Sequence, residues 1–215
     1  MTTNVYIDGY NLYYGALKGT SYKWLDLSRF CAILLPNHNI RRIRYFTARS
    51  AALPHDPDIP TRQDTYLRAL RTIPHLQIHF GQFVSHDRAF PQYPLVYQNP
   101  SNKPRMVRVW RTEEKGSDVN LATYLLRDGF LGEYDEAVVI SNDSDLTEPI
   151  KVVVSDLKKP VTVVNPFPKS KMSSNLRRTA TRAFLEINPS VLKRAQFPPQ
   201  LADKNGTFTK PRTWT

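Results

Sequence analysis

The residues of this chain best suited to chemistry are four aspartates that lie near the ends of apolar runs. Asp8 ends the first such run, Asp143 and Asp145 follow a later one, and Asp118 lies at the start of a predicted helix leading into that later run. Four carboxylates in one cleft need a cation, because at ~5 Å and an effective dielectric of about 20 each like-charge pair costs roughly 3 kcal/mol. Their oxygens suit Mg²⁺ or Mn²⁺, and such an ion activates water for attack at phosphorus.

Each aspartate also has a structural explanation. Asp8 and Gly9 are typical of a turn, and Asp118 is a favourable charge for a helix N-terminus. Asp145 is a suitable N-cap residue, with Glu148 completing a capping box. All of these explanations would have to hold together, at one edge of one sheet, for the cluster to have no function.

Polar and basic residues beside the aspartates fit the same site. Asn11 could orient a ligand water or touch the metal, or it could simply cap the first helix. Ser141 and Asn142 flank the later acidic pair and could orient its carboxylates. Lys115 and Arg111 precede Asp118 in the chain and are candidates to meet a phosphate oxygen, the alternative being plain surface charge.

The elements that must position these residues alternate between strand and helix patterns. This alternation predicts an α/β fold with a mostly parallel sheet covered by helices on both faces. Ligands of such sheets bind outside the carboxyl ends of the strands, where the aspartates are predicted to meet. Strands are predicted at 4–7, 40–47, 76–84, 137–141 and 161–164, and helices at 25–35, 61–73, 117–130, 147–158 and 173–187.

Two segments depart from this alternation. Residues 85–105 are rich in proline and polar groups and form a predicted excursion, for which residues 106–110 could supply the closing strand of a hairpin. The domain is predicted to span 1–187, and 188–215 form an irregular tail. Phe197, Phe208 and Trp214 favour a tail that packs on the domain, and a disordered end is the alternative.

Charge is distributed unevenly along the 215 residues, whose formal net charge is +11. Residues 1–112 carry a net +9 and residues 157–215 a net +10, whereas residues 113–156 carry −8. Basic surfaces attract polyanions, and an acidic island within one would repel them unless a cation neutralises it. The alternative for the island is a solvated helical face.

Arginines and aromatic residues alternate in two segments, a combination that single-stranded nucleic acid uses for phosphate contacts and base stacking. Arg44 and Arg108 are the candidates for substrate contact, and the alternative is the solvent-facing side of an amphipathic strand. The first segment contains Arg41, Arg42, Arg44, Tyr45, Phe46 and Arg49, and the second contains Arg105, Arg108, Trp110 and Arg111.

Several classes of protein are disfavoured by the sequence. No apolar run approaches the ~18 residues of a membrane span, and the N-terminus lacks the pattern of a signal peptide. Cys31 is the single cysteine, so the expected location is a reducing cytoplasm. The five histidines form no zinc pattern, and neither GxGxxG nor a Walker loop occurs. Tyr10 stands where a haloacid-dehalogenase-type phosphatase would have a second aspartate.

Three ordered motifs carry a family resemblance: VYIDGYNL at the start, EEKGSDVNLATYLL in the middle and AVVISNDSDLTEPI after it. Over residues 4–187 the chain resembles NYN-domain proteins, in particular the LabA-like branch of the PIN-fold nucleases. The resemblance implies a three-layer α/β/α fold and a Mg²⁺- or Mn²⁺-dependent ribonuclease whose products carry a 5′-phosphate and a 3′-hydroxyl. It also implies metal-binding roles for Asp8, Asp118, Asp143 and Asp145, with Asn11 as the accompanying polar residue.

The acidic loop departs from the usual family pattern, because Asn142 and Leu146 stand where many relatives have Gly and Phe. Asparagine tolerates left-handed backbone conformations, so the loop shape can survive. The leading hypothesis is a metal-dependent ribonuclease acting on single-stranded or structured RNA. An RNA-binding or regulatory protein with a vestigial metal site is the main alternative, and a glycosyltransferase with a nucleotide-sugar motif at Asp143 and Asp145 is a third. The sequence is compatible with a monomer or a homo-oligomer.

Overall fold

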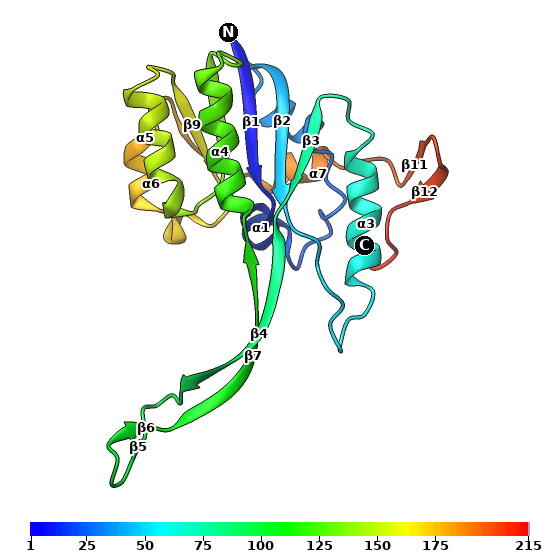
Figure 1. The fold of residues 1–215 in the computed structure, drawn as a ribbon. Coiled ribbons are helices and arrows are strands. Elements are labelled where there is room, and N and C mark those ends of the chain that lie inside the picture. The colour runs from blue at the N-terminus through cyan, green and yellow to red at the C-terminus, as the bar shows by residue number, and fades with distance from the viewer. Residues whose placement is uncertain (215) are drawn as a thin grey trace.

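The computed structural model describes residues 1–214, and its centre is a six-stranded, all-parallel sheet (Figure 1). The strand order is β10-β9-β8-β1-β2-β3, so β1 lies in the middle of the sheet. The predicted α/β class with a central parallel sheet is confirmed. The strands are β1 (Thr2–Asp8), β2 (Asn39–Thr47), β3 (Leu76–Phe80), β8 (Glu136–Ile140), β9 (Val161–Asn165) and β10 (Phe184–Glu186).

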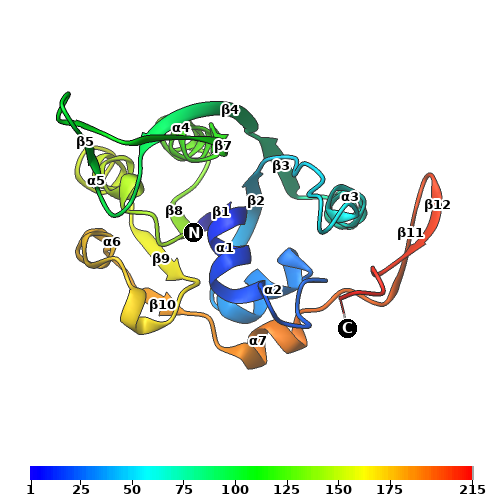
Figure 2. The same ribbon diagram turned by 90° about the horizontal axis from the view of Figure 1, so that it is seen from below.

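Helices cover both faces of the sheet, as Figure 2 shows from below. One face carries α1 (Gly9–Leu12), which continues as a π-helical segment through Leu17, together with α2 (Leu27–Leu34), α3 (Ile59–Leu70) and α7 (Pro189–Arg194). The other face carries α4 (Ser117–Phe130), α5 (Thr147–Ser155) and α6 (Ser174–Thr179). Among the described residues, the longest helix has 14 residues, and none combines the length and apolar character needed to cross a bilayer.

The core is divided by the sheet into two apolar layers. Side chains alternate along β1, so Val5 and Ile7 pack under α2 and α3, whereas Tyr6 packs under α4. All three are fully buried. Residues 5–7 of β1 therefore form a continuous apolar run, as expected of a central parallel strand covered on both sides.

The predicted helix at 173–187 is wrong in its second half. Helix α6 ends at Thr179, and residues 184–186 form the edge strand β10, which pairs in parallel with β9 (Phe184 opposite Val163). Ser173 caps α6 as its side chain accepts a hydrogen bond from the Leu176 amide. Pairing with an open sheet edge outweighs the helical pattern of residues 180–187, because it satisfies backbone groups that β9 would otherwise leave unpaired.

The predicted strand at 76–84 is divided at Gly81 into β3 and β4 (Gln82–Pro91). A β-carbon at Gly81 would lie 2.6 Å from the Lys115 carbonyl oxygen and 2.9 Å from the Ser117 amide nitrogen. Glycine is therefore required here by close approach of the backbone, at the point where the chain leaves the sheet.

A long hairpin extends from this point away from the rest of the molecule (Figure 1). Strand β4 pairs antiparallel with β7 (Met106–Lys115), and the short strands β5 (Tyr97–Gln98) and β6 (Lys103–Pro104) form the tip. We call residues 82–115 the arm. The predicted closing strand at 106–110 lies within β7, and the hairpin begins shortly before the predicted excursion of 85–105 and ends well after it.

The C-terminal tail packs around Trp24. The Trp24 ring contacts the rings of Phe197, Phe208 and Trp214 at centroid distances of 5.7, 6.4 and 6.3 Å. Its Nε1 donates a hydrogen bond to the Pro198 carbonyl oxygen at 2.8 Å. The tail comprises α7 followed by the hairpin of β11 (Gln200–Asp203) and β12 (Gly206–Thr209).

Candidate functional site

Asp8 is the most buried acid of the site, with 2% of its surface exposed at the carboxyl end of β1. Its Oδ1 accepts a hydrogen bond from the Asn11 amide at 2.9 Å, which caps α1. Its Oδ2 accepts hydrogen bonds from Asn11 Nδ2 at 2.5 Å and from Ser141 Oγ at 2.9 Å. Burial raises the pKa of Asp8, the Asp143 charge adds to the rise, and these three donors oppose it.

The loop after β8 brings the second acidic pair to the same edge. Strands β1 and β8 are parallel neighbours, so their carboxyl ends meet. Ser141 Oγ also accepts a hydrogen bond from the Asp143 amide at 3.1 Å, and Asp143 Oδ1 accepts one from the Asp145 amide at 3.0 Å. The Asn142 amide donates to Asn11 Oδ1 at 3.2 Å. Ser141 and Asn142 therefore tie this loop to the Asp8 turn.

Asp118 joins the group from the first turn of α4. Its pKa is raised to about 7, first by burial and then by the negative charges of Asp8, Asp143, Glu114 and Asp145. Asp8 and Asp118 line the same small cleft, and Ser141 Oγ links Asp8 to the Asp143 amide. The structure thus places Asp8, Asp118 and Asp143 at one edge of the sheet, with Asp145 next to them in the loop after β8.

Glu114 is a further acid of the site that the sequence prediction missed. It lies at the end of β7, accepts a hydrogen bond from the Ser117 amide at 3.1 Å, and lines a cleft of about 260 Å³. The middle motif, EEKGSD, contained the signal, but nothing in it distinguishes Glu114 from its neighbour Glu113. The cleft is lined by Asp8, Tyr10, Asn11, Tyr14, Phe83, Glu114 and Asp118.

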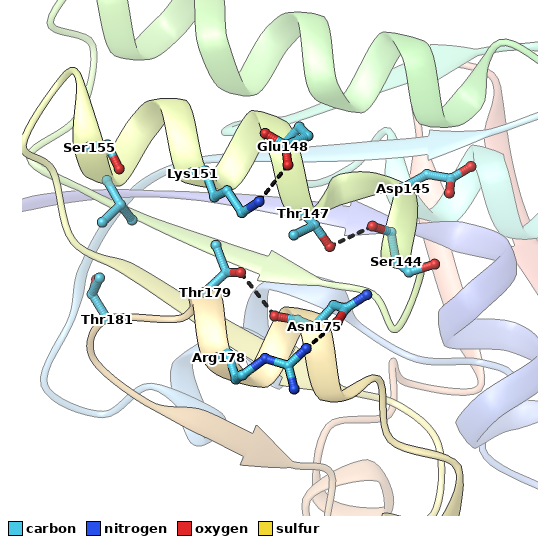
Figure 3. A pocket seen from close by; sticks show the side chains of 11 residues that line it. Ser144, Asp145, Thr147, Glu148, Lys151, Ser155, Asn175, Arg178, Thr179 and Thr181 are labelled. Carbon is cyan, nitrogen blue, oxygen red and sulfur yellow. Dashed lines mark hydrogen bonds and ion pairs between the residues drawn. The ribbon is translucent and has the colours of Figure 1, made fainter.

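A second cleft, of about 890 Å³, opens between α5 and α6 (Figure 3). Asp145 lies in the wall of this second cleft and not in that of the first. Lys151 and Arg178 bring positive charge to it, but Lys151 is paired with Glu148 at 2.5 Å and Arg178 donates to Asn175 at 2.5 Å. The acidic loop thus has a narrow acidic cleft on one side and a wider mixed-charge cleft on the other.

The donor set fits a hard divalent cation by its chemistry, because it consists of carboxylate, amide and hydroxyl oxygens. Across residues 1–214, however, no three His, Cys, Asp or Glu side chains are arranged closely enough to hold an ion as they stand. A bound cation would draw these carboxylates together, which their mutual repulsion opposes without one.

The predicted substrate-binding cations lie at different distances from this group. Lys115 and Arg111 lie on β7, each 2.7 Å from Glu113. Arg108 lies further out on the arm, paired with Asp87. Arg44 is not brought to the site: it is 3% exposed and its guanidinium is held by Asp128 at 2.6 Å and 3.0 Å.

Arg44 belongs instead to a buried polar group under α4. Asp128 is fully buried, and it also accepts a hydrogen bond from the Tyr6 hydroxyl at 2.9 Å. Arg44 Nη1 donates to Gln77 at 2.6 Å and lies 3.0 Å from His79 Nε2. The strand alternation that suggested a surface arginine was correct about the face of β2, but α4 covers that face.

The chain is similar to known proteins in sequence and in fold. The chain is 32% identical over 241 residues to 6-hydroxy-3-succinoylpyridine 3-monooxygenase HspA of Pseudomonas putida, with 100% of this chain and 75% of that protein covered. A crystal structure of a protein of unknown function from Vibrio parahaemolyticus superposes with a TM-score of 0.56 at 15% identity, over 87% of this chain and 93% of that one. This likeness supports the fold.

The family is shown by the match of residues 2–188 to the NYN domain. The match spans the whole sheet, the four aspartates and the arm, and leaves out most of the C-terminal tail. The predicted resemblance is confirmed: this chain belongs to the NYN domain family.

Proposed function

We propose that this protein is a metal-dependent ribonuclease that hydrolyses RNA at the cluster around Asp8. The observation that carries the proposal is the position of three acids at one sheet edge: Asp8 and Asp118 line one cleft, and Ser141 Oγ links Asp8 to the Asp143 amide. Family membership supports it, because the NYN fold is PIN-like and such families are typically ribonucleases.

The chain's own residues have distinct roles in this proposal. Asn11 and Ser141 fix the orientation of the Asp8 carboxylate through their hydrogen bonds. Asp8, Asp118 and Asp143 would hold Mg²⁺ or Mn²⁺, with Asp145 and Glu114 as additional acids. When bound, the cation supplies Lewis acidity and lowers the pKa of water. In the reaction the attacking water gives up a proton as its oxygen bonds to phosphorus, the bond from phosphorus to the 3′-oxygen breaks, and that oxygen takes up a proton.

The test is a cleavage assay of labelled RNA and DNA of the same sequence in Mg²⁺, Mn²⁺ or EDTA. We expect cleavage of RNA that EDTA abolishes, and its loss in Asp143→Asn. Asp156→Asn is the matched control, because Asp156 is an exposed acid at the far end of α5. RNA binding without cleavage in any metal would instead favour a non-catalytic RNA-binding protein.

A second candidate function is oxygenation of a small aromatic ring. The observation that favours it is the 32% identity, over the whole chain, to a protein named as a 6-hydroxy-3-succinoylpyridine monooxygenase. The aromatic side chains of Tyr10, Tyr14 and Phe83 in the small cleft are also suited to such a ring. One atom of O₂ would enter the ring and the other would leave as water, with two electrons from a reduced nicotinamide or flavin.

This candidate is tested by incubating the protein with 6-hydroxy-3-succinoylpyridine, O₂ and a reduced nicotinamide or flavin. Consumption of O₂ that depends on the substrate, together with disappearance of 6-hydroxy-3-succinoylpyridine in chromatography, would support oxygenation. Absence of both, together with metal-dependent RNA cleavage by the same preparation, would exclude it.

A further inference from the structure

The arm is a two-stranded ribbon that extends outward from the sheet (Figure 1). A two-stranded hairpin is marginally stable at best in water, because one ribbon cannot bury an apolar face against itself. Large apolar side chains nevertheless stand exposed on the arm, among them Tyr93 at 95% and Trp110 at 73%. Exposed apolar surface of this kind is typical of a site that binds a ligand or a partner.

The root of the arm is part of the acidic cleft. Phe83 of β4 and Glu114 of β7 lie opposite each other in the ribbon, and both line the cleft with Asp8 and Asp118. The ring of Phe83 meets that of Tyr10 edge to face at 5.8 Å. An elongated ligand bound at the carboxylates can therefore continue along the first residue pairs of the arm.

The register identifies which side chains continue this surface. Opposed residues of an antiparallel ribbon point to the same side, and successive pairs alternate. The pairs Asp87 with Trp110 and Ala89 with Arg108 therefore lie on the face that begins with Phe83 and Glu114. Arg88, opposite Val109, lies on the other face.

The charge of the arm matches a polyanion. The arm as a whole, residues 82–115, contains six basic side chains and three acidic ones, a net +3, and Arg108 is the basic residue that the register places on its cleft-side face. Arg108 is paired with Asp87, but both side chains are more than half exposed, so little free energy holds the pair together. The arginine can exchange this partner for a phosphate, which like a carboxylate accepts two parallel hydrogen bonds from a guanidinium.

We propose that the cleft-side face of the arm binds single-stranded RNA. In this complex Trp110 stacks on a base and Arg108 donates hydrogen bonds to a phosphate. The arm thereby binds the part of the RNA that lies next to the bond cleaved at the cluster around Asp8. This inference rests on the proposed ribonuclease function for its choice of RNA. It rests on the arm's own register, exposure and charge for the residues.

The first test is RNA binding in EDTA, which blocks cleavage and leaves the arm intact. The probe is a fluorescently labelled single-stranded RNA of about 20 nucleotides, longer than the ~4–16 nucleotides of a typical single-strand binding site. Trp110→Ala is expected to weaken binding by about 5- to 150-fold, the loss typical of one stacked base. When the logarithm of the binding constant is plotted against the logarithm of the salt concentration, Arg108→Gln is expected to make the slope less steep by about 0.7. This is the value for one phosphate contact with a single strand.

Arg88→Gln is the matched control, because it removes the same charge from the same arm on the opposite face. We expect it to bind RNA within about twofold of the wild-type protein, as for an exposed residue outside the contact. Wild-type binding by both Trp110→Ala and Arg108→Gln, or an equal loss in Arg88→Gln, would overturn the proposal.

The second test removes the arm and keeps the cleft. Residues 87–110 are replaced by an Asn-Gly turn, which joins the paired residues His86 and Arg111 and leaves Phe83 and Glu114 in place. This protein is expected to cleave a short oligonucleotide at the wild-type rate and to lose efficiency only on long RNA. If it instead changes from dimer to monomer in sedimentation with RNA binding unchanged, the arm is a contact between copies and the proposal is overturned.

The two proposals can fail separately. Arm-dependent RNA binding without cleavage in Mg²⁺ or Mn²⁺ would support the arm and contradict the ribonuclease. Metal-dependent cleavage of long RNA that is unaffected by all arm variants would support the ribonuclease and contradict the arm.

Discussion

At the scale of single residues, the site depends on opposing effects at Asp8. Burial disfavours its charged form, while Asn11 and Ser141 donate hydrogen bonds that favour it. A carboxylate held in one orientation at a buried position is pre-organised for a cation, because its side-chain entropy has been lost on folding. Substituting either donor is therefore expected to affect the site more than the fold.

Asp128 offers a test of the buried polar group beneath α4. We expect Asp128→Ala to lower the free energy of unfolding by about 3–5 kcal/mol, because it leaves the buried Arg44 charge without its partner. The control is Asp64→Ala, which removes the same kind of pair with Arg49 at an exposed site and should cost about 1 kcal/mol or less. Urea denaturation of both variants measures the difference. If the two variants lost the same free energy of unfolding, burial of the pair between Arg44 and Asp128 would make no difference to stability.

The lowered pKa of His79 predicts that the stability of the protein depends on pH. Half-burial and the Arg44 charge lower its pKa to about 4, although the charge of Asp128 acts in the opposite sense. The unfolded chain takes up this proton near pH 6.5, so the contribution of His79 is fully present above that pH and is lost as pH falls toward 4. His79→Gln should therefore lose less stability than wild type between about pH 7.5 and about pH 5 in urea titrations. An identical loss in both proteins would contradict the assignment.

Arg44 shows where residue-level prediction stops. Its position on a strand could be inferred from alternation, and so could its side of the sheet. Its partner Asp128 lies on a helix 84 residues later in the chain, and no local pattern links them. The positions of Asp8, Asp143 and Asp145 were easier to predict, because each follows a buried strand and the ends of neighbouring parallel strands meet.

At the scale of elements, the strands of the sheet were predictable and its edge was not. β1, β8 and β9 contain short apolar runs, a pattern typical of a buried parallel strand. Residues 184–186 carry a helix-like pattern, and they become β10 because β9 offers an open edge. Pairing of that kind depends on the assembled sheet, which the local sequence does not describe.

The tail gives a prediction at this scale. Trp24→Ala should lower the free energy of unfolding by about 3–5 kcal/mol. The buried Trp24 ring belongs to the apolar layer that contains α2, and it contacts Phe197 and Phe208 of the tail. Thermal and urea unfolding measure the effect. Tyr93→Ala removes a ring that is 95% exposed at the tip of the arm, and should change stability by about 0.5 kcal/mol or less. A loss below about 1 kcal/mol for Trp24→Ala would mean that the tail does not stabilise the domain.

At the scale of the whole molecule, the structure gives the uneven charge distribution a shape. Part of the acidic segment forms the cluster at the sheet edge, and the remainder includes Asp128, which neutralises Arg44 inside the fold. The arm, whose sequence is basic overall, extends away from the sheet (Figure 1). The −8 of residues 113–156 therefore overstates the charge that a ligand meets, because one of these acids is consumed by an internal pair.

The central claim is that the cluster around Asp8 cleaves RNA with the help of a divalent cation. The most direct measurement is the single-turnover rate of RNA cleavage in Mn²⁺ for wild type, Asp8→Asn and the control Asp156→Asn. Asn preserves the shape of Asp8 and its cap on α1 and removes the charge, so folding should be retained. We predict a loss of more than about 100-fold for Asp8→Asn, above the range typical when only a supporting partner of a ligand is removed, and none for the control. Equal rates for wild type and a folded Asp8→Asn protein would contradict the account.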